Sequence, residues 1–402
     1  MFMGKIIVAP ETLDHSFIPE KLPTRENIRS ELFLKIRQFF SQSSGKGFKG
    51  IHISGSVGSG KTVLSRRVAA DLKTVFRENL IICYVNCRFS KRVYRVLAQI
   101  ASQISSSLPQ RGLSKDEFLE LIFLATKERA QRLLIILDEI DSLFWGNEGE
   151  KATDMLYSLS RYLEKTTFSN FFVATISISR TEEFIFSWLD PATRASFIHE
   201  KKHLEAYGPG ELVEILRYRA KLAFRNGTIS EESLSYLANF VANQAWGNAR
   251  TAIDLLRLAG EIAEHKNEDV VRPEHIRLAI KEYALIPALD MEKLIGLGRH
   301  KLILLLATIL ALKNSNRSYV TRTMVQEYYR ELCAEYGEEP RKTTQIWRYL
   351  REIEYELSGI VEVTVSGKNQ RGRSTRISIN VPLDTLEKNI VKILKKIPSG
   401  LG

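Results

Sequence analysis

Residues 55–62 have the types and spacing of a phosphate-binding loop. They read Gly-Ser-Val-Gly-Ser-Gly-Lys-Thr, which fits the pattern G-x-x-x-x-G-K-[ST]. The glycines let several backbone N–H groups turn toward a phosphate, and a helix that follows adds the positive end of its dipole. We expect Lys61 to reach the β- and γ-phosphates of ATP or ADP, and Thr62 to hold Mg²⁺. The predicted cofactor-binding residues of the loop are Gly55, Ser56, Val57, Gly58, Ser59, Gly60, Lys61 and Thr62.

An acidic pair follows an apolar run farther along the chain. Residues 133–137 are Leu-Leu-Ile-Ile-Leu, and Asp138 and Glu139 come directly after them. An uninterrupted apolar run is typical of a strand buried on both faces of a parallel sheet, and such sheets place ligands at the carboxyl ends of their strands. We expect Asp138 to complete the Mg²⁺ site and Glu139 to activate a water for attack on the γ-phosphate.

Alternating strands and helices are needed to hold these groups together. Apolar strand patterns alternate with helical ones after the loop, which predicts an α/β fold with a doubly wound parallel sheet. From Gly210 the chain reads as helical, and Arg250 lies at the start of one of these helices, where a basic side chain opposes the helix dipole unless a phosphate offsets it. The predicted strands are 50–53, 80–85, 132–137 and 171–177, and the predicted helices of the second part are 211–224, 230–244, 249–265 and 272–283.

The last part of the chain predicts a winged helix. Three helices, 299–312, 321–336 and 343–357, precede a hairpin formed by 360–365 and 377–381. From Met291 onward there are 19 lysines and arginines against 12 acidic residues. A basic hairpin tip and a polar helix start suit DNA phosphates and base edges, although a winged helix can also serve protein contacts. The predicted DNA-binding residues here are Lys342, Thr343, Thr344, Gln345, Arg348, Lys368, Arg371, Arg373 and Arg376.

Composition narrows the class of protein. The chain has 402 residues, 44% of them apolar, and a net charge of +11, which suggests a polyanionic partner. Three cysteines cannot form a disulfide framework, and we find neither a signal peptide nor an apolar run of about 18 residues. We therefore expect a cytoplasmic, nucleoid-associated protein with no membrane partner. A basic stretch after the second strand, which includes Arg88 and Arg92, is either a second DNA contact or a solvated helix face.

Together these patterns resemble one family, the archaeal origin-recognition replication initiators. These are AAA+ ATPases related to the eukaryotic origin recognition complex and its helicase-loading factor. The motif at 137–141 is shared by AAA+ proteins generally, whereas 17–26, 111–114, 271–276 and 358–361 look like this family in particular. The resemblance implies an AAA+ base at 1–206, a helical lid at 207–288 and a winged-helix domain at 289–402.

The resemblance also implies roles for individual residues. Pro19 and Arg25 fall where the family lines the adenine, and Arg250 matches the sensor-2 arginine that contacts the phosphates. Arg194 matches the arginine finger, which acts on the nucleotide of a neighbouring subunit. The stretch from Arg88 to Arg111 resembles the family's DNA-contacting insertion. The implied partners are double-stranded origin DNA, other initiator subunits on adjacent sites and the replicative helicase.

One position departs from the family pattern. The family places an asparagine, sensor 1, after an Ile-Ser pair, but here Ile178 follows Ile176 and Ser177. Isoleucine cannot orient a water, so we expect slow hydrolysis unless Thr175, Ser177 or Ser179 substitutes. Two other interpretations stay open: a transcription or signalling ATPase with a winged helix, and a paralogue that regulates initiation negatively with little hydrolysis.

Overall fold

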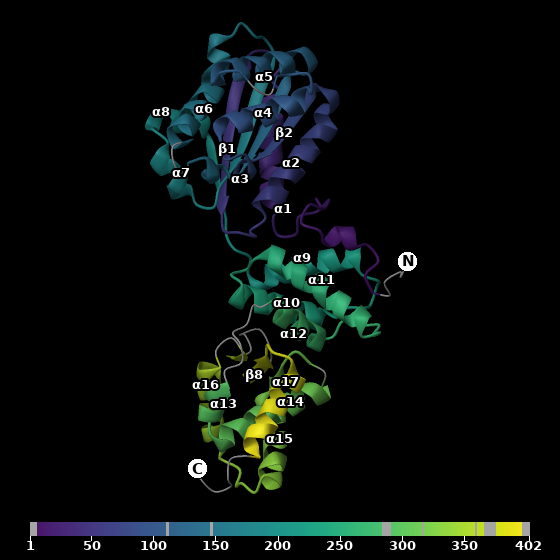
Figure 1. Cartoon of the computed structure of the whole chain (residues 1–402). Helices are drawn as coiled ribbons and strands as arrows, with labels where there is room; N and C mark the ends of the chain where they lie inside the picture. Colours follow the sequence, from purple (N-terminus) through teal and green to yellow (C-terminus); the bar gives the residue numbers. More distant parts are fainter. Residues whose placement is uncertain are drawn as a thin grey trace. The chain divides into compact units, whose positions relative to one another are not determined.

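The computed structural model describes residues 6–109, 112–144, 148–283, 291–315, 317–357, 360–365 and 375–395 (Figure 1). The chain divides into two compact units. One unit runs from Ile18 to Tyr207, and the other contains the first 17 residues together with everything from Gly208 onward. Within the described ranges, no helix is long and apolar enough to cross a membrane.

The first unit is built on a five-stranded parallel sheet, as the sequence predicts. The strand order is β2-β3-β4-β1-β5, and every residue of β4 is buried. Strand β5 is not predicted because its residues, Glu-Lys-Lys-His-Leu, are mostly charged. It lies at the edge of the sheet and pairs with β1 alone, where charged side chains can reach solvent. The strands are β1 Lys46–Gly55, β2 Leu80–Asn86, β3 Arg132–Asp138, β4 Phe171–Ile178 and β5 Glu200–Leu204.

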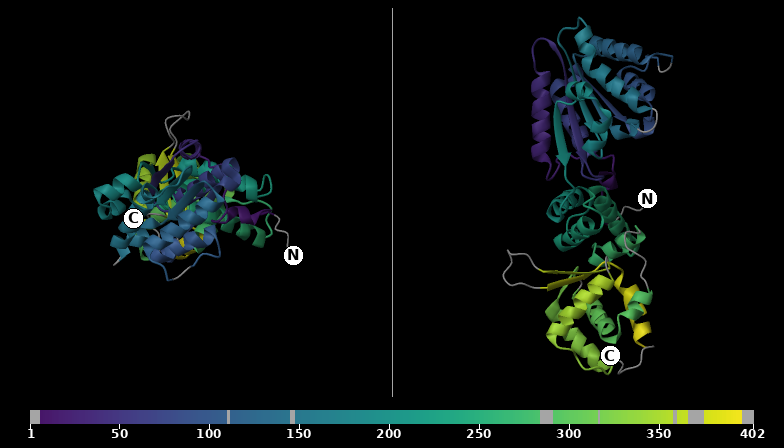
Figure 2. Two further views of the ribbon diagram at one scale, coloured as in Figure 1. Left: turned by 90° about the horizontal axis from the view of Figure 1, so that it is seen from above. Right: turned by 90° about the vertical axis from the view of Figure 1, so that its left-hand side faces the viewer.

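Helices cover both faces of this sheet. Alternate residues of β3 enter different clusters: Leu134 packs with α1 and α2, and Leu133 packs with α4, α5 and α6. The right-hand view of Figure 2 shows α1, in purple, on the opposite side of the sheet from the blue helices. Ser114 and Glu117 form a capping box at the start of α5. The helices are α1 Glu26–Phe40, α2 Lys61–Phe76, α3 Cys87–Ser90, α4 Val93–Ile104, α5 Lys115–Arg129, α6 Gly149–Arg161, α7 Glu182–Trp188 and α8 Pro191–Phe197.

The second unit begins with four helices that correspond to the predicted lid. They are α9 Pro209–Ala223, α10 Glu231–Gln244, α11 Ala249–His265 and α12 Pro273–Glu282. The N-terminal arm packs on them, because the amides of Ile6 and Ile7 donate to Glu264 Oε1 at 3.0 and 2.8 Å. Residues 6–17 therefore lie with the lid helices. The division into three domains at 206 and 288 stays a prediction.

The rest of this unit is a winged helix, as predicted. Its core surrounds α14, where 11 residues are buried, and its small antiparallel sheet has the order β6-β8-β7. The sequence does not predict the two-residue strand β6 or the last helix. Lys368, Arg371 and Arg373 of the predicted hairpin tip lie outside the described residues, as does Arg111. The elements are α13 Met291–Gly296, α14 Arg299–Ser315, β6 Val320–Thr321, α15 Arg322–Glu335, α16 Thr343–Glu356, β7 Val361–Val365, β8 Thr375–Ile379 and α17 Leu383–Leu394.

Candidate nucleotide site and nucleic-acid interface

The loop between β1 and α2 has the backbone that a phosphate site needs. Gly55, Gly58 and Gly60 have φ values of +148°, +79° and +92°, which side chains disfavour. A Cβ on Gly60 would lie 2.4 Å from the Tyr207 hydroxyl, and one on Gly55 would lie 2.3 Å from the Leu204 carbonyl oxygen. Since Gly60 is the N-cap of α2 and has no side chain, it leaves the first N–H groups of that helix free to meet an anion.

Lys61 folds back over the start of this loop. Its Nζ donates hydrogen bonds to the carbonyl oxygens of Gly55 and Ser56 at 2.5 and 2.7 Å. Burial lowers the pKa of the Lys61 amine, while the charges of Asp138 and Asp141 oppose that shift. Ser59 is fully buried and donates to the Ser56 carbonyl at 2.9 Å, which closes the turn from the inside. The amine therefore lies within the loop, where an incoming phosphate would compete with two carbonyl oxygens.

Asp138 joins the two predicted motifs. Its Oδ2 accepts a 2.8 Å hydrogen bond from the Thr62 hydroxyl, 76 positions away in sequence, and a 2.7 Å bond from the Tyr84 hydroxyl. The carboxylate is only 3% exposed, so these bonds offset its desolvation. The predicted Mg²⁺ ligands, Thr62 and Asp138, are thus brought together. Tyr84 was not predicted as a site residue. Only its position near the carboxyl end of β2 could have indicated it.

Glu139 lies beside β2 in an uncommon backbone conformation. Its φ is +50°, a region that non-glycine residues seldom occupy. The Glu139 carboxylate accepts from Asn86 Nδ2 at 3.3 Å and faces Arg88 Nη1 at 3.5 Å. Asn86 pairs in register with Asp138 across the β2–β3 ladder, which explains how it reaches the next residue. Arg88, predicted to bind DNA, therefore contacts the predicted catalytic base.

Ile178, the residue expected at the sensor position, is the last residue of β4. Ile178 is 1% exposed and packs in the apolar cluster behind α1 and α2. The Ser177 and Ser179 hydroxyls are engaged by the two ring nitrogens of His52, at 2.9 and 3.0 Å. The hydroxyl of Thr175 is buried and has no hydrogen-bond partner among the residues described. Ile178 and these three residues are therefore all buried, and the absence of a sensor-1 side chain stays a prediction.

Two residues that sequence analysis did not single out border the loop on this side. The Gly55 amide donates to the Arg180 carbonyl at 3.2 Å, which holds the chain after β4 against the loop. The Arg180 charge contributes to lowering the pKa of Lys61. Burial raises the pKa of Asp141, whose Oδ1 is buried without a hydrogen-bond partner in the described part of the chain. Only their positions could have indicated Arg180 and Asp141 as site residues, because each follows the carboxyl end of a central strand.

The two residues expected to line the adenine are both buried. Pro19 is buried, and Arg25 is only 9% exposed. Arg25 Nη2 donates to the Glu205 carbonyl at 2.6 Å, and its guanidinium lies 4.4 Å from the centre of the Tyr207 ring. Tyr207 in turn reaches Gly60. Arg25 thus supports the loop through Tyr207, and an adenine contact stays a prediction.

The two other predicted arginines lie in different units. Arg194, in α8, donates through Nη2 to the carbonyls of Phe186 and Leu189 at 2.6 and 3.3 Å, so it is turned toward its own α7. Arg250 is exposed in the first turn of α11, where Asn248 Oδ1 caps the helix by accepting from the Arg250 amide at 3.0 Å. A role for either residue at a nucleotide stays a prediction.

Exposed basic residues follow β2. Arg92, at the start of α4, is exposed, and the side chain of Arg88 is 59% exposed. Between them Phe89 is 81% exposed, which is unusual for a phenylalanine. An exposed aromatic ring between guanidinium groups suits both the phosphates and the base faces of a nucleic acid. Arg88 and Arg92 were predicted from the sequence as a possible DNA contact, but Phe89 was not.

Helix α16 presents a polar face to solvent. Ile346, Leu350 and Ile353, which are spaced by three to four residues, are buried, so the core holds the axis of the helix. Thr344, Arg348 and Tyr355 share the opposite face, since they are spaced by four and seven residues. Lys342, Thr343, Thr344 and Arg348 are exposed, and Tyr355 is 82% exposed. Tyr355 was not predicted.

The side chains of Gln345 and Arg376, both predicted to bind DNA, make contacts within the protein. Gln345 lies at the side of α16 and is half-buried, and its Nε2 donates to the Tyr349 hydroxyl at 2.9 Å. The Arg376 guanidinium, in β8, lies 4.5 Å from the centre of the Tyr319 ring. Arg348 is 65% exposed and pairs with Glu352 at 3.4 Å, a contact that an incoming phosphate or base can replace.

Family models match all three parts of the chain. The model described as the Cdc6 AAA+ ATPase-type lid domain matches residues 213–281, and the model described as the CDC6 C-terminal winged helix domain matches residues 292–389. A model of the AAA domain matches residues 46–181. These matches cover both units and include the loop, the acidic pair and α16.

Curated relatives and solved structures agree with these models. The ORC1-type DNA replication protein 1 of Archaeoglobus fulgidus is 31% identical over 381 residues, which cover 94% of this chain and 89% of the relative. The ORC1-type DNA replication protein 2 of Saccharolobus solfataricus is 30% identical over 387 residues, covering 94% and 91%. The crystal structure of Cdc6p from Pyrobaculum aerophilum matches with a TM-score of 0.79 and 29% identity, over 97% of this chain and 99% of that one. The structure of the Aeropyrum pernix ORC1 protein in complex with DNA matches with a TM-score of 0.61 and 25% identity, over 96% and 97%.

Proposed function

Since this chain belongs to the family of archaeal ORC1-type DNA replication proteins, related to Cdc6, we propose that it binds ATP or ADP and that the nucleotide controls its binding to double-stranded origin DNA. The observation that carries the proposal is the 2.8 Å hydrogen bond between Thr62 and Asp138. It joins the phosphate loop to the acidic pair, in a chain that also carries a winged helix with an exposed polar face.

The nucleotide site is assembled from the residues around this bond. The N–H groups of the loop and the Lys61 amine bind the phosphates, and Thr62 and Asp138 hold Mg²⁺, which offsets phosphate charge when it is bound. Glu139 accepts a proton from the attacking water. By family resemblance, Pro19 and Arg25 line the adenine. Arg250 meets the phosphates, and Arg194 acts on the nucleotide of an adjacent initiator subunit.

The DNA interface uses exposed basic and polar groups of both units. Arg348 and Thr344 read base edges from α16, while Arg376 contributes phosphate contacts together with Lys368, Arg371 and Arg373, which lie outside the described residues. Arg88, Phe89 and Arg92 form a second contact. The Aeropyrum pernix ORC1 protein was solved in complex with DNA, which supports this part of the proposal. Bound at an origin, the chain would help to recruit the replicative helicase.

A footprint tests the proposal most directly. The chain, with ATP or ADP, is mixed with DNA spanning the origins of its host, and DNase protection is mapped beside promoter DNA and scrambled duplexes. We expect discrete protection at origin repeats that depends on nucleotide. Protection at promoters alone would overturn the origin assignment and favour a transcription ATPase, and no protection on any duplex would overturn DNA binding.

A second candidate function is supported by one observation. Ile178 is buried in an apolar cluster, and the Ser177 and Ser179 hydroxyls contact the ring of His52, so none of these three side chains is available to orient a water. This favours a regulator that binds origin DNA with very little hydrolysis. ATP turnover with and without origin duplex separates the two functions, because an initiator that hydrolyses ATP as a switch should respond to DNA and a non-hydrolysing paralogue should not.

A further inference from the structure

Arg277, in α12, is a buried charge with no part in the proposed site. It is 2% exposed and heads the set of largest fully buried side chains. Removing a guanidinium from water costs several kcal/mol unless hydrogen bonds replace the lost hydration. The buried guanidinium must therefore be stabilised by the groups around it, and the positions of those groups indicate the role of Arg277.

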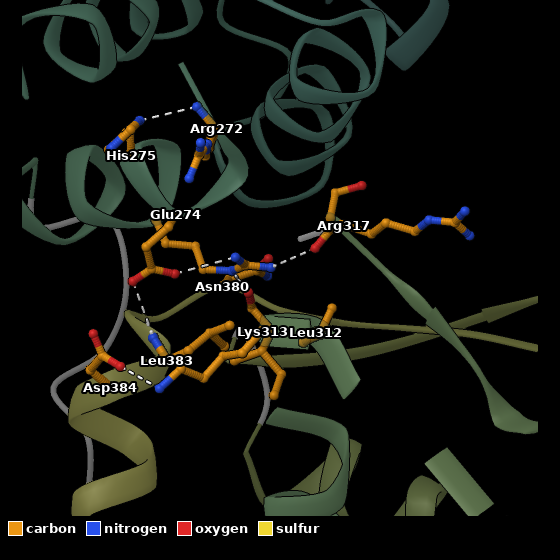
Figure 3. A network of polar contacts seen from close by, with 12 residues as sticks. Arg272, Glu274, His275, Leu312, Lys313, Arg317, Asn380, Leu383 and Asp384 are labelled. Carbon is orange, nitrogen blue, oxygen red and sulfur yellow. Dashed lines mark hydrogen bonds and ion pairs between the residues drawn. The ribbon is translucent and has the colours of Figure 1, made fainter. Parts of the chain in front are cut away.

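The Arg277 guanidinium joins the lid to the winged helix, and Figure 3 shows this junction with Glu274, Arg317 and Asn380 labelled. Its Nε donates to the Ile379 carbonyl at 2.7 Å, and its Nη2 donates to the Arg317 carbonyl at 3.5 Å. Both acceptors belong to the winged helix: Ile379 ends β8, and Arg317 precedes β6. The third contact stays within α12, where Nη1 meets Glu274 Oε2 at 3.3 Å.

Tyr236, in α10, reinforces the same junction. Its hydroxyl bonds the Ile379 carbonyl at 3.0 Å and Asn380 Oδ1 at 3.1 Å. Burial raises the pKa of Tyr236 to about 12, so the phenol stays a neutral donor. The Arg277 guanidinium lies 5.3 Å from the centre of the Tyr236 ring, within cation–π range. Glu274 also accepts from the Leu383 amide at 3.3 Å, which ties the start of α17 to α12.

Further hydrogen bonds surround this centre. Glu232 Oε1 accepts from the Ser318 amide and hydroxyl at 2.8 and 3.0 Å. Glu362 Oε1, in β7, accepts from Gln244 of α10 and from Asn380, each at 3.1 Å. The lid thereby contacts residues in or beside all three strands of the small sheet, at the root of the hairpin.

We propose that Arg277 is a positioning residue that locks the winged helix to the lid, so that the two move as one body when the chain binds nucleotide or DNA. Helix α11, whose first turn carries Arg250, packs on α12. The group expected to meet the nucleotide and the helix expected to meet DNA are then rigidly linked. The chain crosses between its two units only at 17–18 and 207–208, so the proposal confines any reorientation to those crossings. The consequence for DNA rests on the proposed function, whereas the lock itself does not.

Paired spin labels on the full-length chain test the lock. The native cysteines are buried, so labels go to Glu261→Cys, in α11, and Lys392→Cys, in α17, both at exposed positions. We expect one narrow distance distribution that is unchanged by ADP, a non-hydrolysable ATP analogue or duplex DNA. A second pair, Glu261→Cys with Glu128→Cys in α5, reports movement between the units. A lid-to-winged-helix distance that is broad, or that shifts with ligand, would overturn the proposal.

Substitutions then test whether Arg277 provides the lock. Arg277→Met keeps an unbranched side chain but removes the guanidinium, and it should broaden the lid-to-winged-helix distribution. Arg272→Met is the matched control, because Arg272 lies at the start of the same helix but is 53% exposed and pairs only with Glu268 within the described residues. Tyr236→Phe removes the hydroxyl that contacts Ile379 and Asn380, with little change in the shape of the side chain. If Arg277→Met fails to fold, this second variant tests whether the junction provides the lock. Narrow distributions in both variants would overturn the assignment to this junction.

The effect of nucleotide on DNA affinity gives a second test of Arg277, because a simple loss of stability would not change it. The ratio of DNA dissociation constants with ADP and with the ATP analogue measures how strongly nucleotide controls DNA binding. We expect Arg277→Met to bring this ratio within about twofold of one, with binding of DNA in the absence of nucleotide retained. An unchanged ratio would overturn the coupling role. If the native chain binds no DNA, the proposed function fails, but the spin-label distances still decide the lock.

Discussion

Arg88 Nη1 lies 3.5 Å from Glu139 Oε2, so a residue expected to bind DNA contacts the residue expected to activate water. Asn86 Nδ2 holds the other oxygen of the same carboxylate at 3.3 Å. While both contacts persist, Glu139 is drawn toward β2. A DNA phosphate that engaged Arg88 would remove one of them, which links DNA binding to hydrolysis through a single side chain.

We therefore predict that Arg88→Ala raises ATP turnover in the absence of DNA while weakening DNA binding. The ion pair is largely exposed and worth under about 1 kcal/mol, so the increase should be about two- to fivefold. Steady-state phosphate release measures it. Arg92→Ala is the control, since Arg92 is exposed nearby and should affect DNA affinity alone. A fall in turnover for Arg88→Ala would show that the arginine assists the reaction.

Nucleotide affinity should depend on Lys61 and not on Glu139. Lys61→Ala removes the charge expected at the β- and γ-phosphates, so we expect ATP and ADP binding to be lost or severely weakened in calorimetry. Glu139→Gln should bind nucleotide normally and lose hydrolysis, because only the base is removed. Lys46→Ala, at the other end of β1, is a matched control. Unchanged affinity in Lys61→Ala would refute the site.

Turnover should be slow because Ile178, at the expected sensor-1 position, cannot orient a water. We expect a rate about two orders of magnitude below the range of roughly 1–100 s⁻¹ typical of kinases. Ile178→Asn should raise the rate, but it places an amide in an apolar cluster at a cost of about 1–3 kcal/mol in stability. Single-turnover measurements with saturating protein test both statements. A native rate above about 1 s⁻¹ without partners would show that the sensor position is dispensable.

Acid should destabilise the α/β unit through His52. Burial lowers the pKa of His52 from its ordinary value of 6.5 to about 4. Since the folded-state pKa is depressed, the unfolded chain takes up the proton first, and stability falls as the pH drops from about 6.5 to about 4. At about 1.36 kcal/mol per pH unit, the loss approaches roughly 3 kcal/mol. Urea unfolding of the native chain and His52→Gln across this range measures it, and equal pH slopes would contradict the prediction.

The two basic surfaces should contribute differently to DNA binding. Arg348 is presented by a helix that the core holds in place, so Arg348→Ala should lose about 1–3 kcal/mol of preference for the origin site. Its affinity for random duplex should change little. Arg92→Ala should weaken binding to all duplexes alike and reduce the salt slope by about one. Salt titrations on origin and scrambled duplexes compare them. The reverse pattern would mean that the readers are in the insertion after β2.

Local patterns in the sequence were enough to predict much of this protein. The phosphate loop, the apolar run before Asp138 and the capping box at Ser114 each depend on neighbours within a few residues, so their structure follows from their own types and spacing. Apolar positions repeating every three to four residues likewise predict which side of α16 packs inward, and Ile346 and Leu350 are buried accordingly. The family resemblance rests on these same segments.

Tertiary structure alone decided the contacts between distant segments. Tyr84 meets Asp138 because β2 and β3 pair in register, and Ser177 and Ser179 are committed to His52 because β1 and β4 are neighbours. No pattern in the sequence predicts that Arg277 is buried, because a charged residue is ordinarily assigned to the surface. Its burial depends on carbonyl oxygens 40 and 102 positions away, which only the packing of the lid against the winged helix brings within reach.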